Sequence, residues 1–563
     1  MNSISHAGPV TASLDDPFYY LANFRFVLAW VAERYGDLLS DAERAFLADF
    51  ARLPRPSQAL LVRMVMRKGT CFRTGKLRYA EIGDPEAALA PLNEGGWVEV
   101  DPELDLEALF ALLTKAEIVQ ALRHEIAAAG LPASSGKAVL REALEALRLS
   151  PRPLSSWWSQ APDRVVELTQ MAICDRLRLM FFGNLRQDWA EFVLAELGRQ
   201  RFETVELSRE SRAFQTREEV DAYLELHRLR EHLEEGESPQ ALWQEMPTTP
   251  ANPWLEARRA KLLFQLAREA ERRQEHVLAL TIYPDCGHPE ARVRHLRLLE
   301  RRGEFVTAHT LAERAGKAPR SEAESQALER LLPRLRRRLG LPPAPRPPEP
   351  RIERLELCLP PSAAGVEAAV CEHLSSERAP VHYVENTLIG GLFGLLCWRA
   401  IFAPLPGAFF HPFHTGPADL DREDFVARRR EVFDACLGEL DDGRYRDSIR
   451  QTYRAKQGVA SPFVHWPLLS ETLLEQALVS LPATHLKRLF ERLLCDLKAN
   501  RAGLPDLIQL WPPEKGEPGC YRMIEVKGPG DRLQDNQRRW LAFFHRHQMP
   551  VTVCHVTWQD GAR

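Results

Sequence analysis

The sequence predicts a multidomain protein in which a mostly α-helical body is followed by an α/β domain. The length of 563 residues exceeds that of an ordinary single domain. Residues 341–350, LPPAPRPPEP, contain six prolines and predict an extended linker. Before this segment apolar residues recur with helical periodicity, whereas after it strand-like runs alternate with helical ones.

Composition excludes several classes of protein. Hydrophobic content of 45% and charged content of 27% are ordinary for a globular chain, and a net charge of −4 confines any nucleic-acid binding to local basic patches. The ten cysteines form no C-x-x-C pair, which argues against a zinc finger and a disulfide framework. The N-terminus shows no signal-peptide pattern, and the most apolar stretch, Leu388 to Phe402, contains Arg399 and is too short to span a bilayer. We therefore expect a cytoplasmic protein that is not in a membrane.

Residues 1–108 combine helical stretches with two short extended runs, LRYAEI and GGWVEV, in an order that resembles a winged-helix DNA-binding unit. Aromatic side chains interleave with a basic cluster there. Such a cluster can follow a phosphate backbone, although a solvated basic face is the open alternative. Its members are Arg63, Arg67, Lys68, Arg73, Lys76 and Arg78.

Residues 109–150 predict two helices around GLPASSGK, with Thr114 and either Ser134 or Ser135 as N-caps. This segment resembles a SAP-type DNA-binding module, although a generic helical hairpin has a similar pattern. Further domains are expected along the chain. They are a helical connecting region (151–249), helix pairs resembling tetratricopeptide (TPR) repeats (250–340), the linker (341–352) and an α/β catalytic domain (353–563).

Two acids and a lysine in the last domain predict a catalytic site. Met523, Ile524 and Val526 favour a strand, and alternation along it places Glu525 and Lys527 on one face. Asp506 starts another strand-like run nineteen residues before Glu525, with a polar turn between. In an antiparallel hairpin the two carboxylates can meet at one end. Oxygen ligands of this kind select Mg²⁺ or Mn²⁺.

This arrangement resembles the PD-(D/E)XK nuclease superfamily. Within that superfamily the string EVKGPGDRLQDNQRRWL, with GLPD ahead of it, resembles the VRR-NUC branch. The segments GLFGLLCWRAIF and DPFYYLANFRFVLAWV, together with the order of the helical body, resemble the Fanconi-associated nuclease family, and this resemblance covers nearly the whole chain.

The resemblance implies roles for particular residues. A further acid is expected at a preceding helix, and Glu385, before the apolar segment, supplies it. Glu385, Asp506, Glu525 and the backbone carbonyl of Val526 would hold one or two Mg²⁺ or Mn²⁺ ions, and Lys527 would activate the attacking water. Three further residues would contact water or DNA. These are Gln537 as a catalytic residue, Lys498 at a terminal 5′-phosphate and Arg532 on the DNA backbone.

The same resemblance implies a structure-specific DNA endonuclease and 5′-3′ exonuclease that cuts 5′-flap and branched DNA during interstrand crosslink repair. We expect a bacterial-type monomer that lacks the ubiquitin-binding finger of eukaryotic members and associates with the nucleoid when on DNA. Asn536 departs from the lysine that those members carry there. The alternatives are a Holliday-junction resolvase and a non-catalytic scaffold that binds branched DNA.

Overall fold

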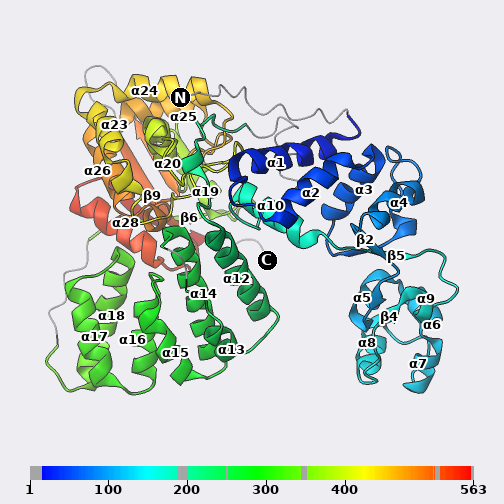
Figure 1. Cartoon of the computed structure of the whole chain (residues 1–563). Helices are drawn as coiled ribbons and strands as arrows, with labels where there is room; N and C mark the ends of the chain where they lie inside the picture. The colour runs from blue at the N-terminus through cyan, green and yellow to red at the C-terminus, as the bar shows by residue number, and fades with distance from the viewer. Residues whose placement is uncertain are drawn as a thin grey trace. The chain divides into compact units, whose positions relative to one another are not determined.

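A computed structural model describes residues 16–187, 189, 201–248, 251–343, 351–511, 513 and 520–559 (Figure 1). Most of the expected linker, residues 344–350, lies outside these ranges. The chain forms two compact units, one made of residues 1–220 and 410–413 and the other of residues 221–409 and 414–563. No helix in the described ranges combines the length and the apolar character needed to cross a membrane.

In the first unit, helices surround a small antiparallel sheet with strand order β1-β5-β2. Ser40 and Glu43 form a reciprocal cap at the start of the second helix. The elements are α1 (Tyr19–Tyr35), α2 (Asp41–Arg52), α3 (Arg55–Val65), β1 (Cys71–Arg73), α4 (Pro85–Glu94), β2 (Val98–Val100), β5 (Val165–Leu168) and α10 (Met171–Phe182).

One predicted strand in this unit is wrong. The run Leu77 to Ile82 forms a loop, and the strand lies earlier, at β1. Leu77 and Ile82 are both buried, but they are five positions apart and enter the core from a loop, so they do not alternate as strand residues do. The second predicted run is a strand at β2.

A small helical module is inserted between β2 and β5. Thr114 caps α6 together with Glu117, as predicted for Thr114, but α8 begins after Gly136, so neither Ser134 nor Ser135 is a cap. The core of the module includes Leu109, Ile118 and Leu140. Its elements are β3 (Glu103–Leu104), α5 (Leu106–Leu112), α6 (Lys115–Ala121), α7 (Arg123–Ala128), α8 (Lys137–Glu145), β4 (Arg152–Pro153) and α9 (Leu154–Trp157).

The second unit starts with a row of helices that lie side by side (Figure 1). Gln274 and Gly303 have positive φ at the equivalent turn of two successive helix pairs. The helices are α12 (Arg217–Glu234), α13 (Pro239–Gln244), α14 (Pro253–Arg272), α15 (His276–Ile282), α16 (Ala291–Arg301), α17 (Phe305–Lys317) and α18 (Glu322–Arg338).

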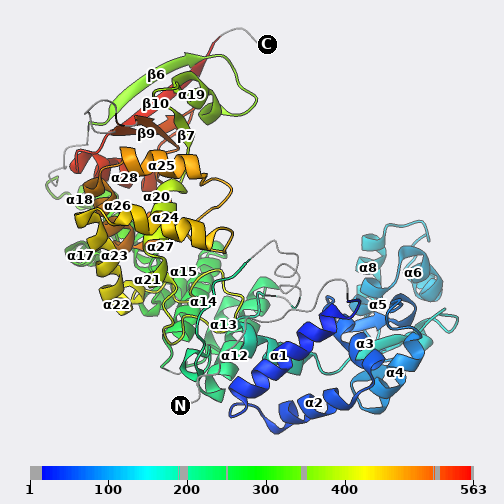
Figure 2. The same cartoon turned by 90° about the horizontal axis from the view of Figure 1, so that it is seen from above.

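The α/β domain follows, built on a five-stranded sheet with order β6-β10-β9-β8-β7 (Figure 2). Strands β6, β10 and β9 run parallel, whereas β8 and β7 are antiparallel to their neighbours. The strands are β6 (Glu353–Leu359), β7 (Val381–Tyr383), β8 (Leu507–Trp511), β9 (Cys520–Lys527) and β10 (Val551–Trp558).

Helices cover this sheet. Ala369 and Val370 of α19 pack on one face, against Ile524 and Val526, while α25 and α28 also contact the sheet. The helices are α19 (Val366–Leu374), α20 (Leu388–Leu396), α21 (Trp398–Ile401), α22 (Phe425–Arg428), α23 (Arg430–Asp442), α24 (Tyr445–Lys456), α25 (Glu471–Ser480), α26 (Ala483–Cys495), α27 (Leu497–Asn500) and α28 (Asp535–Arg546).

Candidate nuclease site

The two predicted strands that carry acids pair as an antiparallel hairpin. Leu507 pairs with Ile524, so Asp506, one residue before β8, comes level with Glu525 in β9. Asp506 Oδ2 accepts a hydrogen bond of 2.7 Å from the backbone N–H of Val526. The structure therefore brings the two carboxylates together at one end of the hairpin, as the spacing predicted.

Glu525 is completely buried, and its charged neighbours are one lysine and other acids. Lys527 Nζ lies 2.7 Å from Glu525 Oε1, but neither oxygen of Glu525 accepts a well-oriented hydrogen bond from the described residues. Burial and then the charge of Asp506 raise the pKa of Glu525 to about 7, although Lys527 opposes the shift. Burial likewise raises the pKa of Asp506, against the hydrogen bond from Val526. Buried acids with raised pKa values are typical of functional sites.

Glu385 lies in the turn between β7 and α20 rather than on a helix. Its side chain is exposed and accepts a hydrogen bond of 2.5 Å from the hydroxyl of Tyr383. Asn386, which has a positive φ, accepts a hydrogen bond from the N–H of Leu504 and so ties this turn to the loop that leads to Asp506. The negative charge of Glu385 contributes to the raised pKa values of Asp506 and Glu525, which places it beside the hairpin end.

Sequence reasoning missed a fourth acid. Glu367, in the first turn of α19, also contributes to the raised pKa of Asp506 and therefore lies near the same cluster. Val366, its neighbour, lies close to Gly528, directly after Lys527. The available signal was an acid at the start of the amphipathic run VEAAVCEHL.

Gln537 lies in the first turn of α28, where its Oε1 accepts a hydrogen bond of 2.8 Å from the N–H of Gln534. The preceding residue, Asn536, packs against Gly503 in the loop before Asp506, where the absence of a Cβ leaves room for this close approach. The same helix end is fixed by the helical repeats, because Arg330 of α18 holds Asp535 through two hydrogen bonds of 2.6 Å. The first turn of α28 is therefore anchored from two directions.

The side chains at the hairpin end fit a hard divalent cation. Glu385, Asp506 and Glu525 supply only oxygen atoms as ligands. Neither oxygen of Glu525 accepts a well-oriented hydrogen bond from the described residues, so a cation could bind there without displacing one. No three His, Cys, Asp or Glu side chains in the described part of the chain are already gathered around one point. Lys527 covers one oxygen of Glu525 and Glu385 turns to Tyr383, so rotation of those side chains would complete the cluster.

The basic residues predicted to bind DNA divide into two groups. Arg73 is buried between Asp163 and Glu117, and Arg63 donates to Glu81 and stacks on Tyr20, so protein groups hold both guanidinium groups. The other members are exposed. They are Arg67, Lys68, Lys76 and Arg78.

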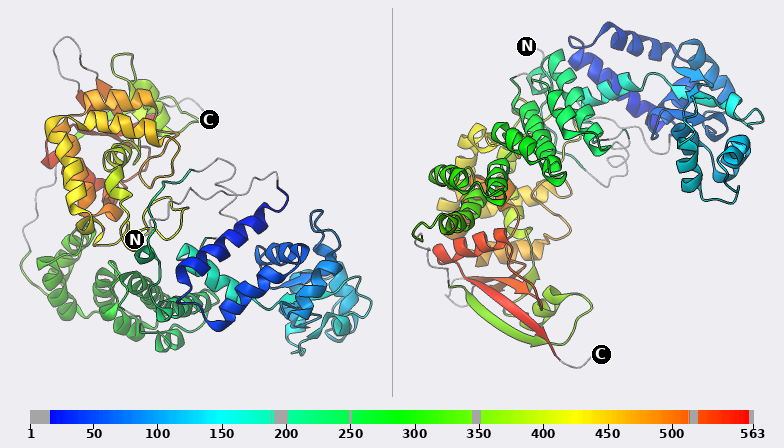
Figure 3. Two further views of the ribbon diagram at one scale, coloured as in Figure 1. Left: turned by 45° about the horizontal axis from the view of Figure 1, so that its top comes forward. Right: turned by 90° about the horizontal axis from the view of Figure 1, so that it is seen from below.

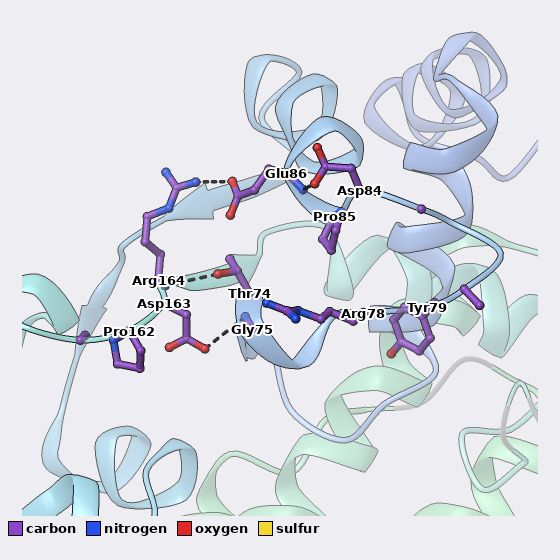
Figure 4. A pocket seen from close by; sticks show the side chains of 13 residues that line it. Thr74, Gly75, Arg78, Tyr79, Asp84, Pro85, Glu86, Pro162, Asp163 and Arg164 are labelled. Atoms are coloured by element: carbon purple, nitrogen blue, oxygen red, sulfur yellow. Dashed lines mark hydrogen bonds and ion pairs between the residues drawn. The ribbon is translucent and has the colours of Figure 1, made fainter.

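Arg78 lines an open cavity of about 800 Å³ in the first unit (Figure 4). The cavity is also lined by Arg164, paired with Glu86, and by Asp163, which accepts a hydrogen bond from the N–H of Gly75. The positive side chains here are therefore mixed with acids, and Arg78 has no ion-pair partner in the described ranges.

Lys498 and Arg532 lie in the second unit, and both are exposed. Burial lowers the pKa of His288 in the helical repeats, and the charges of Lys498 and Lys261 add to this shift. Lys498, on α27, therefore lies near His288. Arg532 lies in the loop between β9 and α28, a few residues after Lys527. Both positions allow contact with a DNA backbone.

The sheet order and the cluster of Asp506, Glu525 and Lys527 define a nuclease of the VRR-NUC type. The family model of the VRR-NUC domain matches residues 440–558. Two further models match the first unit, the "FAN1, HTH domain" at residues 18–99 and the "Fanconi anemia-associated nuclease SAP domain" at residues 103–157. VRR-NUC nucleases generally depend on a divalent metal ion.

The chain belongs to the Fanconi-associated nuclease family. It is 57% identical over 549 residues to the Fanconi-associated nuclease 1 homolog of Pseudomonas aeruginosa, covering 97% of each chain. It is 24% identical to human Fanconi-associated nuclease 1, covering 96% of this chain but 62% of the human one. A crystal structure of paFAN1 bound to 5′-flap DNA with a 2-nucleotide flap and a gap superposes with a TM-score of 0.93, at 56% identity, over 98% of this chain and 100% of that chain. The predicted family, fold class and nuclease activity are confirmed.

Proposed function

We propose that this protein is a structure-specific endonuclease that cuts 5′-flap and branched DNA and digests 5′ to 3′, acting in interstrand crosslink repair. The carrying observation is the fully buried Glu525, which lies beside Asp506 and 2.7 Å from Lys527 Nζ and has a raised pKa. The solved relative bound to 5′-flap DNA supports the substrate class.

Glu385, Asp506, Glu525 and the carbonyl of Val526 would hold Mg²⁺ or Mn²⁺. A bound ion of this kind polarises a phosphate and makes its water more acidic. Lys527, released from Glu525 when the charge of that acid is compensated, orients the attacking water and stabilises charge on the phosphate. Gln537, on the anchored turn of α28, orients water or phosphate, and Glu367 adds negative charge close to Asp506.

DNA would be held by exposed basic groups in both units. Arg67, Lys68, Lys76 and Arg78 contribute contacts to duplex phosphates. Lys498 and Arg532, closer along the chain to the cutting residues, contact the strand to be cut, and Lys498 favours a terminal 5′-phosphate. These phosphate contacts do not distinguish one base from another, so the protein would select a flap by the shape of the DNA.

Cleavage of a labelled 5′-flap DNA with Mg²⁺ or Mn²⁺ tests the proposal. Wild type is compared with Asp506→Ala and with Glu372→Ala, which removes an exposed acid of α19. We expect wild type and Glu372→Ala to cut near the junction, while Asp506→Ala binds the flap but cuts at least about a hundredfold more slowly. Undiminished cutting by Asp506→Ala contradicts the site. Tight flap binding without cutting by wild type supports the scaffold alternative.

The large helical body favours a monomer that grips one junction over a dimeric Holliday-junction resolvase. Gel filtration, together with a four-way junction substrate, separates the two. A dimer that cuts four-way junctions symmetrically would contradict the flap proposal. We also propose that the protein works without a ubiquitin-binding finger and is cytoplasmic, associating with the nucleoid on DNA.

A further inference from the structure

The catalytic face of the sheet continues beyond β9 onto two strands that have no part in the proposed site. His555 of β10 pairs with Lys527 of β9 and, on its other side, with Glu356 of β6. Side chains of paired residues share one face of a sheet, so this row lies on the face of Glu525 and Lys527. In the neighbouring row, Arg354 is two strands away from Glu525.

This part of the face is accessible. Lys527 is the last residue of β9, whereas β10 continues to Trp558 and β6 to Leu359. Figure 3 shows these two long strands, yellow-green and red, side by side at the end of the domain. His555 is half-buried, and the side chains of Arg354 and Glu356 are 62% and 72% exposed.

His555 has the chemistry of a hydrogen-bond donor to phosphate. No hydrogen bond to its ring is formed within the described ranges. Burial and then the charges of Arg354 and Lys527 lower its pKa, against Glu356. The imidazole is therefore neutral at neutral pH, with one N–H to donate. Among the described residues, Arg354 forms an exposed ion pair of 3.1 Å with Glu356, a weak contact that a phosphate can replace.

We propose that His555 and Arg354 form a phosphate-contacting subsite for the cut DNA strand, on the side of β9 opposite Asp506. Neighbouring strands of a sheet are about 4.8 Å apart, so His555 is one such step from Lys527 and Arg354 is a step further. His555 donates to the phosphodiester next to the one being cut, and Arg354 contacts a later one. The inference rests on the proposed nuclease function.

Single-turnover cleavage of 5′-flap DNA tests the subsite with His555→Ala, His555→Gln and the control Thr557→Ala. Thr557 is exposed on the same face, past the end of β9. We expect His555→Ala to lower the rate at subsaturating enzyme about tenfold, because a hydrogen bond to a charged group is lost. Glutamine, which keeps an N–H donor, restores most of the rate, and Thr557→Ala matches wild type.

A second measurement separates contact from packing. One phosphate at a time near the cut is replaced by a neutral methylphosphonate. At the contacted phosphate, the methylphosphonate slows cleavage by wild type but slows His555→Ala little further. At other phosphates, the rate losses from the methylphosphonate and from His555→Ala multiply. Equal rates for His555→Ala and wild type, or multiplying effects at every position, overturn the subsite. Failure of wild type to cut the unmodified flap would instead overturn the proposed function.

Discussion

Two clusters of charge in this protein, each around a buried side chain, have similar composition and opposite character. Each contains two carboxyl groups and one basic side chain. In the first unit, Arg73 donates to Asp163 at 2.7 and 2.9 Å and to Glu117 at 2.5 Å, so each acid is bonded to the guanidinium. In the second, Lys527 lies 2.7 Å from Glu525, yet neither oxygen of that acid accepts a well-oriented hydrogen bond.

The pKa values follow this difference. Burial opposes ionisation of Glu117, but the N–H of Thr114 and Arg73 outweigh it and hold its pKa at about 2. Burial and Asp506 raise the pKa of Glu525 to about 7. The hydrogen bonds that Glu117 accepts favour its ionised form, whereas burial of Glu525 beside a second acid disfavours ionisation and leaves that carboxyl group available to a cation.

The largest expected effect comes from removing the buried carboxylate of Glu525. Glu525→Gln should lower the single-turnover rate of flap cleavage at least about a thousandfold, since ion binding and the activation of water both need the carboxylate. Flap binding, measured by fluorescence anisotropy, should remain. The matched change in the other cluster, Glu117→Gln, should cut at the wild-type rate. Equal loss in both variants would show that the two clusters do not differ in function.

Removing the basic side chain should lower the stability more in the cluster of Arg73 than in the cluster of Lys527. Arg73→Met leaves Glu117 and Asp163 without their partner and should lower the free energy of unfolding of the first unit by about 3 kcal/mol. Lys527→Met should abolish cleavage with a smaller loss of stability. Calorimetric unfolding measures both, with Arg67→Met, at an exposed position, as the control. A stable Arg73→Met protein would refute the structural role of its cluster.

The pH dependence of stability should have opposite signs for the two acids. The folded-state pKa of Glu525 is raised, so its ionisation destabilises the fold as pH rises from about 4.5 towards 7. In EDTA at pH 8, Glu525→Gln should therefore unfold at a higher temperature than wild type, and the difference should disappear below about pH 4.5.

The depressed pKa of Glu117 gives the reverse behaviour. Its contribution is present above the unfolded value near 4.5 and is lost as pH falls through about 2. Glu117→Gln should accordingly lower the unfolding temperature at pH 8. Calorimetry of both variants between pH 4 and 8 tests the signs, and a shift of the same sign in both contradicts the comparison.

The smallest effects are expected among the arginines and lysines of the basic cluster. Replacing Lys68 or Arg78 with alanine should reduce the slope of log affinity against log salt by about 1 each, since one phosphate contact is lost. Arg63→Ala, which removes a side chain already bonded to Glu81, should leave the slope unchanged. Anisotropy titrations over a range of NaCl concentrations measure the slopes, and a reduced slope for Arg63→Ala would contradict this division.

Local patterns predicted the parts of the fold that depend on neighbouring residues. Alternation predicted β9 and the shared face of Glu525 and Lys527, and Thr114 was predicted as an N-cap from the residue type that precedes a helical run. The strand predicted at Leu77 to Ile82 failed because burial there comes from a loop. Glu367 was missed because an acid in the first turn of a helix has the same local pattern whether or not it faces a site.

The sequence by itself determined the domain order, the nuclease family and the acids of the hairpin, because strand period and motif spacing are properties of short segments. The tertiary structure decided which charged side chains have ion-pair or hydrogen-bond partners. Arg73 finds its partners 44 and 90 residues away, and His555 joins Lys527 and Glu356 in one row only when three strands pair. Burial and pairing between distant segments set the energy of each charge, and neither can be read from the residues beside it.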